Sequence, residues 1–196
     1  MSVTPVSICS NALLMLGDSP IASLDDDTDR ARIASNLWEP VRDFVLRSHP
    51  WNCAIKRVSL SPDVAAPAFD WAYQYTLPDD YLKALSIGEQ GREGEYRIEG
   101  RKLLADDNPL LLRYVFKNTN TGSYDSMLVW ALTCCMRAVF AYPITQSGSM
   151  EELLTNTLRP LLRQAKAVDG HEDTPEQLGD NPIVAARFCG FGMAGR

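Results

Sequence analysis

The sequence predicts an α+β protein: a helical bundle with an inserted small antiparallel β-sheet domain and an extended C-terminal arm. Apolar residues recur at helical spacing near both ends of the chain and alternate with polar residues at strand spacing in its middle, and this periodicity is lost after about residue 169. We therefore place the bundle at 1–50 and 124–170, the β domain at 51–123 and the arm at 171–196.

Composition sets the first limits on function. The chain has 196 residues, of which 45% are hydrophobic and 22% charged, so it is large enough to bury a core without a metal or a disulfide. With a formal net charge of −6, attraction of the whole molecule to nucleic acid or to anionic membranes is not expected, and a local basic patch stays open. Five cysteines without CxxC spacing predict reduced thiols in a cytoplasm.

The first helix begins at Thr4 and Pro5, a cap and first-turn pair, because proline lacks an N–H that would be unpaired at this position. Gly17 ends it. One apolar stripe lies between these signals, formed by Ile8, Cys9, Ala12, Leu13 and Leu16.

The second helix begins in a cluster of aspartates, where negative charge favours a helix N-terminus. We expect Asp26 or Asp27 to be the cap. Pro40 predicts a kink or an early break near Trp38, because it removes one backbone hydrogen bond. His49 is expected to end the helix, and no carboxylate stands at ligand spacing around it.

The middle of the chain predicts one antiparallel sheet of four to six strands. Residues alternate in burial over 71–77 and 110–117, and shorter strands are expected at 83–87, 96–98 and 103–104. The predicted core of this β domain consists of Trp71, Tyr73, Tyr75, Leu77, Tyr96, Tyr114 and Phe116. These aromatic residues lack the accompanying basic residues that a nucleic-acid stacking surface needs.

Two helices follow, beginning near Ser126 and Ser149. Arg137 is the only charge between Ser126 and Thr145, so this helix should be central to the bundle or covered by a neighbouring subunit. Pro160 is an irregularity within the last helix. No run of about 18 uncharged apolar residues occurs, and we expect no membrane-spanning segment.

Residue patterns give no catalytic, metal or cofactor site, so no cofactor is expected. The segment 25–29 resembles the start of a calcium loop, but Arg30 and Asn36 stand where that loop needs glycine and glutamate. His49 and His171 are the only histidines and lack ligand spacing. The pairs Asp79–Asp80 and Glu151–Glu152 are expected to be solvated rather than catalytic.

The order of segments resembles the tail tubular protein A family of short-tailed phages. The resemblance covers most of positions 5–170 and includes ALLMLGDSPIASL, the run FDWAYQYTLPDDYLKALSI, YRIEGRKLL, a strand RYVF and two closing helices. Its most specific piece is the aromatic strand that runs into Leu77-Pro78-Asp79-Asp80-Tyr81-Leu82.

The resemblance implies a structural virion protein without enzymatic activity. Members are head-to-tail adaptors: twelve copies form a ring in the neck region of the viral tail, between the portal protein and a tail nozzle protein of the tail tubular protein B type. Double-stranded DNA passes through the centre during genome ejection without sequence-specific binding. The family resemblance also leaves tail fibres as a further partner and implies synthesis in the cytoplasm of a bacterial host.

The C-terminal arm is expected, by the same resemblance, to dock on the portal. Its candidate contacts are Ile183, Val184, Arg187, Phe188 and Phe191. In the family the arm often carries an aromatic residue before the final arginine motif, where this chain has aliphatic residues, and the two phenylalanines are the expected substitutes.

Three alternatives stay open. A neck or tail-completion protein of a long-tailed phage would share the bundle but lack the LPDDYL region. A small phage hydrolase or nuclease would need a cleft with a metal or a perturbed acid, which the scarcity of histidine disfavours. A nucleic-acid-binding module would show DNA affinity that falls steeply with salt.

Overall fold

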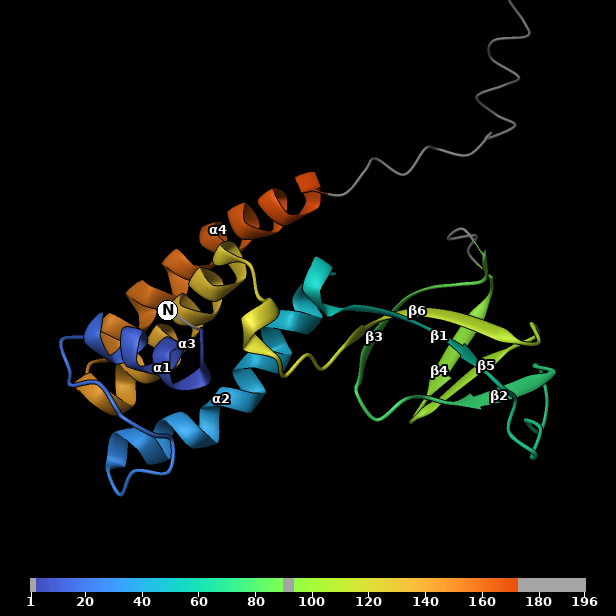
Figure 1. Cartoon of the computed structure of the whole chain (residues 1–196), viewed down its shortest axis with the longest axis horizontal. Helices are drawn as coiled ribbons and strands as arrows, with labels where there is room; N and C mark the ends of the chain where they lie inside the picture. Colours follow the sequence, from blue (N-terminus) through green and yellow to red (C-terminus); the bar gives the residue numbers. More distant parts are fainter. Residues whose placement is uncertain (1–2, 90–93, 173–196) are drawn as a thin grey trace, which may run out of the picture.

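The computed structural model describes residues 3–89 and 94–172, and over these it is an α+β fold, as the sequence predicts. Figure 1 shows two lobes, with the helices gathered in one and the strands in the other. The helices come from both ends of the chain, and the strands lie between them in sequence.

Helix α1 (Pro5–Leu14) begins as predicted, at Thr4. The Thr4 hydroxyl accepts a hydrogen bond from the Ser7 N–H (3.1 Å), and the Ser7 hydroxyl accepts one from the Thr4 N–H (2.9 Å), which closes a capping box. After the helix, Gly17 has a φ of 82°, a left-handed conformation that favours glycine.

Helix α2 (Asp29–Ser48) begins one residue after Thr28, which is its N-cap. The prediction of an aspartate cap is wrong because Asp26 accepts hydrogen bonds from two backbone N–H groups upstream of itself, at Ala22 and Ser23. The Asp26 carboxylate therefore bonds to the segment before the helix, and the Thr28 hydroxyl accepts the hydrogen bond from the Ala31 N–H that caps the helix.

Of the two expected effects of Pro40, a kink or an early break, the break does not occur, because helix α2 continues through Pro40. Proline removes only one hydrogen bond. Buried residues on both sides of Pro40 hold the helix on the bundle, namely Ala31, Ala34, Trp38, Val45 and Leu46. His49 ends the helix as expected.

Helix α3 (Ser126–Thr145) is the central helix and packs against α1, α2 and α4 (Gly148–Glu172). Asp125 caps it by accepting hydrogen bonds from the N–H groups of Met127 and Leu128. Among the described residues, α3 alone is long and apolar enough to cross a membrane, and half of it is buried inside the bundle. A bundle's core helix meets the same criterion.

The strands form two antiparallel sheets rather than the single predicted sheet. The first has the order β1 (Ile55–Leu60), β6 (Leu110–Phe116), β3 (Tyr81–Ile87). The second has the order β2 (Tyr73–Thr76), β5 (Lys102–Ala105), β4 (Tyr96–Glu99). Strand β1 was absent from the sequence prediction. Short 3-10 turns at Asn52–Ala54 and Thr121–Ser123 flank the β lobe.

The two sheets share one core, which is why two short sheets are stable where each alone would not be. Of the predicted core, Tyr75, Leu77 and Tyr114 are fully buried, while Tyr73, Tyr96 and Phe116 are half-buried against them. Trp71 lies before β2 and borders a shallow hollow at the end of β3.

The LPDDYL segment joins the two sheets. Leu77 enters the shared core, and Tyr81 stacks on Tyr114 at 6.0 Å between ring centroids. Asp80 accepts hydrogen bonds from the Lys56 ammonium (2.6 Å) and from the Tyr114 hydroxyl (2.9 Å). Burial alone would favour the neutral acid, but these hydrogen bonds outweigh it and hold the pKa of Asp80 below its usual value.

We predict that Asp80→Asn lowers the free energy of unfolding by about 1–2 kcal/mol at pH 7, because it weakens two hydrogen bonds to a charged acceptor. The folded-state pKa lies below the unfolded value of 3.8, so the carboxylate stabilises the fold above pH 3.8 and loses this effect as pH falls below it. The difference between wild type and variant in urea unfolding should shrink toward pH 2.

Asp79→Asn is the matched control, because the Asp79 side chain is fully exposed and its ion pair is with exposed Arg101. Equal losses of unfolding free energy for Asp79→Asn and Asp80→Asn would contradict a stabilising role of the Asp80 carboxylate.

Candidate interaction surfaces

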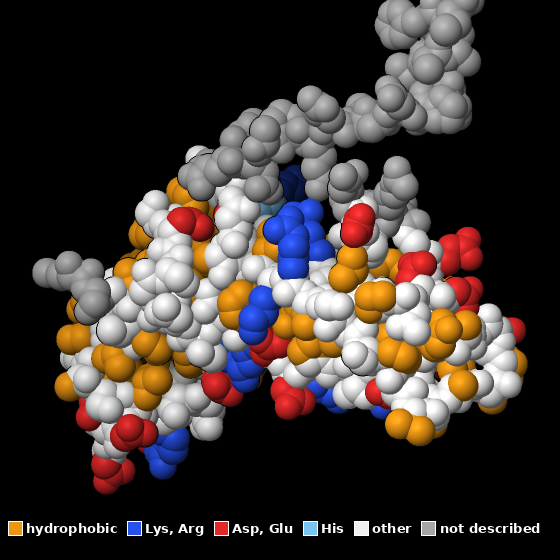
Figure 2. All heavy atoms as spheres, turned by 45° about the vertical axis from the view of Figure 1, so that its right-hand side comes forward, with side chains coloured by type: hydrophobic (Ala, Val, Ile, Leu, Met, Phe, Trp, Pro, Cys, Tyr) orange, Lys and Arg blue, Asp and Glu red, His pale blue; other side chains and the backbone are white. Residues whose placement is uncertain are grey.

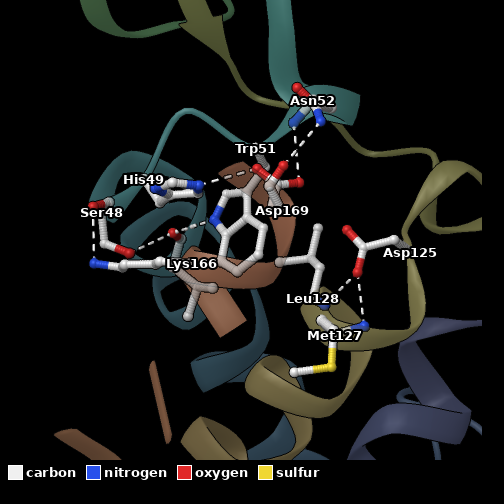
Figure 3. Close-up of polar contacts among 10 residues, drawn as sticks. Ser48, His49, Trp51, Asn52, Asp125, Met127, Leu128, Lys166 and Asp169 are labelled. Atoms are coloured by element: carbon white, nitrogen blue, oxygen red, sulfur yellow. Dashed lines mark hydrogen bonds and ion pairs between the residues drawn. The ribbon is translucent and has the colours of Figure 1, made fainter. Parts of the chain in front are cut away.

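A polar cluster joins the end of α2 to the last turns of α4 (Figure 3). The His49 imidazole lies 2.9 Å from the Asp169 carboxylate and meets the edge of the Trp51 ring. The other carboxylate oxygen of Asp169 accepts a hydrogen bond from the Asn52 N–H (3.4 Å). Trp51 is fully buried and its indole N–H donates to the Val45 carbonyl (3.0 Å).

Lys166 reinforces this cluster one turn earlier on α4. Its ammonium donates to the Ser48 carbonyl (2.9 Å), which lies in the last turn of α2. A cation is favourable there because the final carbonyls of a helix lack partners within the helix. The end of α2 and the end of α4 are therefore held together by two sets of polar contacts, one from Lys166 and one from Asp169.

Asp169 is only 5% exposed, and burial raises its pKa, against the lowering effects of the Asn52 N–H and of His49. The sequence has no carboxylate at ligand spacing around His49, and the fold brings Asp169 to it from α4. The two residues are 120 positions apart, and local spacing carries no signal for such a pair. One signal was available: Leu162, Ala165 and Asp169 follow helical spacing, so the apolar face of α4 extends to this carboxylate.

The cysteines of the described residues are not activated nucleophiles. Burial raises the pKa of Cys9 and of Cys135 to about 12 and that of Cys53 to about 11. A thiol with such a pKa is almost entirely protonated near neutral pH, and the thiolate is the reactive form. Cys134 lies beside Cys135 on α3, and its pKa is also raised by burial.

No group of three or more His, Cys, Asp or Glu side chains that could hold a metal ion occurs within residues 3–89 and 94–172. In the aspartate segment 25–29, Asp26 is engaged with the backbone and Asp29 forms an ion pair with Arg32. Asp79 and Asp80 bind different cations, Arg101 and Lys56.

Apolar side chains remain exposed where α3 and α4 are joined. Tyr142 is 50% exposed and Leu153 58% exposed, and Val139 and Met150 are exposed near them in sequence. We call these four residues the hairpin apolar surface. Buried Ala138, Ala141 and Leu154 form a separate small cluster in the same hairpin. Clusters of exposed apolar residues mark interaction sites more often than random surface does.

The predicted docking residues of the arm, Ile183, Val184, Arg187, Phe188 and Phe191, lie outside the described residues. Of the predicted arm, 171–196, the structure describes only the first two positions, which belong to α4. No family model matches this chain, and no curated protein matches its sequence.

We predict that Asp169→Ala lowers the free energy of unfolding by about 2–4 kcal/mol, because it leaves His49 and the Asn52 N–H without their acceptor. Asp169→Asn should lower the free energy of unfolding by less, since its side chain keeps an acceptor oxygen. Glu152→Ala, at an exposed site on the same helix, is the control and should be near neutral. Chemical unfolding followed by Trp fluorescence measures all three, and an Asp169→Ala chain as stable as the control would contradict this role.

Proposed function

We propose that this chain is a structural virion protein, a head-to-tail adaptor that forms a ring of about twelve copies between the portal and the tail nozzle. The observation that carries the proposal is the architecture: helices from both ends of the chain form one bundle, and a β lobe inserted between α2 and α3 projects from it (Figure 1). This agrees with the fold that the resemblance implies, and the LPDDYL segment serves as the link between the two sheets.

The hairpin apolar surface supports assembly into a ring. Tyr142 and Leu153 give up solvent contact when a second subunit covers them, which favours association by about 25 cal/mol per Å² of apolar area. In a closed ring the partner surface on the neighbouring copy is a different one, so each subunit carries both halves of the contact.

Charge supports a channel through which DNA slides. Twelve copies of a chain with formal charge −6 give 12 × −6 = −72, and such a ring repels the phosphate backbone instead of binding it. In this proposal the C-terminal arm docks on the portal, the opposite end receives the nozzle protein or fibres, and the protein is located in the neck of the virion tail. Such an adaptor acts by binding and needs no turnover.

Mixing the purified chain with portal rings tests the proposal. We expect light scattering to show a defined ring-sized increase in mass on the portal, because the arm and the hairpin apolar surface are both used there. A chain that ignores the portal at every protein concentration would contradict the adaptor function.

We predict that Tyr142→Asp combined with Leu153→Asp abolishes ring formation on the portal while leaving the monomer folded, because both side chains are exposed. Phe69→Asp is the matched control, since Phe69 is 76% exposed in the loop before β2, away from the hairpin. Analytical ultracentrifugation with portal rings distinguishes the variants. Unchanged assembly of the double variant would show that the contact between subunits lies on another surface.

A further inference from the structure

A surface hollow of about 420 Å³ lies on the β lobe, at the end of β3 that is remote from the bundle. The first residues of β3 lie beside α2, where Arg47 donates to the Leu82 carbonyl. The hollow is open at the surface, and its walls include Trp71, Ile87, Gly94, Glu95 and Tyr96. Its volume lies in the range of small-ligand sites and leaves room for one long side chain.

Gly94 lets the chain pass close to β3 at this hollow. A Cβ atom at this position would lie 2.7 Å from Cδ1 of Ile87 and 3.0 Å from a carboxylate oxygen of Asp107. Real Cβ atoms essentially never approach another atom as closely as the first of these distances. A side chain here would therefore displace Ile87, which is buried in the shared core of the two sheets. With glycine in this place, the Asp107 carboxylate stands next to the hollow.

Two aromatic side chains, Trp71 and Tyr96, line the hollow and are half-buried. Neither ring contacts another ring or a cation within residues 3–89 and 94–172. In the same lobe, by contrast, the Lys56 ammonium lies over the Phe116 ring, 4.9 Å from its centroid. The face of an aromatic ring attracts cations electrostatically. The hollow therefore offers two rings to a cation from outside the described structure.

Three carboxylates stand around these rings. Glu95 lines the hollow, and the Asp107 carboxylate lies beside it at Gly94. The Asp106 carboxylate accepts a hydrogen bond from the Ala72 N–H (2.8 Å), next to the tryptophan. None of the three carboxylates forms an ion pair with another residue that the structure describes. Figure 2 shows Asp and Glu side chains on the outer part of the β lobe, whereas Lys and Arg gather along its junction with the bundle.

We propose that this hollow binds the guanidinium group of an arginine side chain that a partner protein presents. A guanidinium is planar and weakly hydrated, so it can stack on an aromatic ring and still donate two parallel hydrogen bonds to a carboxylate. Trp71 and Tyr96 provide the rings, and Glu95 provides the carboxylate. Asp106 and Asp107 add negative charge at the rim. A hollow that is open at the surface receives such a side chain without a change in the backbone.

Other ligands fit the hollow less well. No group of three carboxylates, histidines or cysteines in the described parts of the chain could hold a metal ion, so the rim is not a metal site. A neutral sugar would stack on the rings but would leave the three carboxylates without a counter-charge. The ammonium of lysine is more strongly hydrated than a guanidinium and lacks its planar shape. The inference goes beyond the proposed function and holds whether or not the chain joins a portal.

Titration of the ¹⁵N-labelled full-length chain with a capped Gly-Arg-Gly peptide tests the proposal. We expect saturable NMR shifts, at millimolar peptide, of the Trp71 indole N–H and of the Glu95 and Tyr96 backbone N–H groups. The same peptide with citrulline, which has the shape of arginine without its charge, should give no saturable shift. A Gly-Lys-Gly peptide should bind several-fold more weakly. The proposal is overturned if the arginine peptide does not saturate these signals, or if the citrulline peptide, the lysine peptide or N-acetylglucosamine binds as well as it does.

Two variants of strand β4 and the residue before it sharpen the result. Glu95→Gln removes one charge at an exposed site and should weaken binding of the arginine peptide about two- to fivefold. Glu99→Gln is the matched control, because Glu99 is also exposed, lies at the other end of β4 and pairs with Arg97. Unchanged NMR signals of the bundle show that each variant is folded. Equal affinities of the two variants for the arginine peptide would overturn the proposal.

Discussion

The chain passes between the bundle and the β lobe twice, and the structure depends on holding these two passages side by side. Asn118 does this: its side-chain amide donates to the Cys53 carbonyl of the first passage (2.7 Å) and to the Ser123 hydroxyl of the second (2.9 Å). The Tyr124 hydroxyl donates to the Asn118 carbonyl (2.6 Å). Asn118 is buried, so each of these polar groups must be paired inside the protein.

The same region fixes the end of α4. The first passage contains Trp51 and Asn52, and α4 places Lys166 and Asp169 on them. A buried carboxylate requires partners, and His49 and Asn52 provide them only when α2, the passage and α4 are all in position. The position of the last turns of α4 therefore follows from contacts made at residues 48–52.

Charge is distributed unevenly over the described structure. Acidic residues lie near the start of α2, and cations collect at its other end and on the adjacent sheet face. The two ends of α2 are separated by about 28 Å, because 19 steps at 1.5 Å each connect them.

The sequence by itself determined the helices, five of the six strands and the α+β class, because burial periodicity is a local property of each segment. The cap at Thr4 follows from two neighbouring residues and is correctly predicted. The division of the strands into two sheets depends on which strands pair, and pairing joins residues far apart in the chain, such as Ile55 and Val115. The pairing of His49 with Asp169 and the alignment of Arg57 with Arg113 are likewise decided only by the tertiary structure. A residue's own neighbours set its secondary structure, whereas a buried charge or a basic surface exists only when distant segments meet.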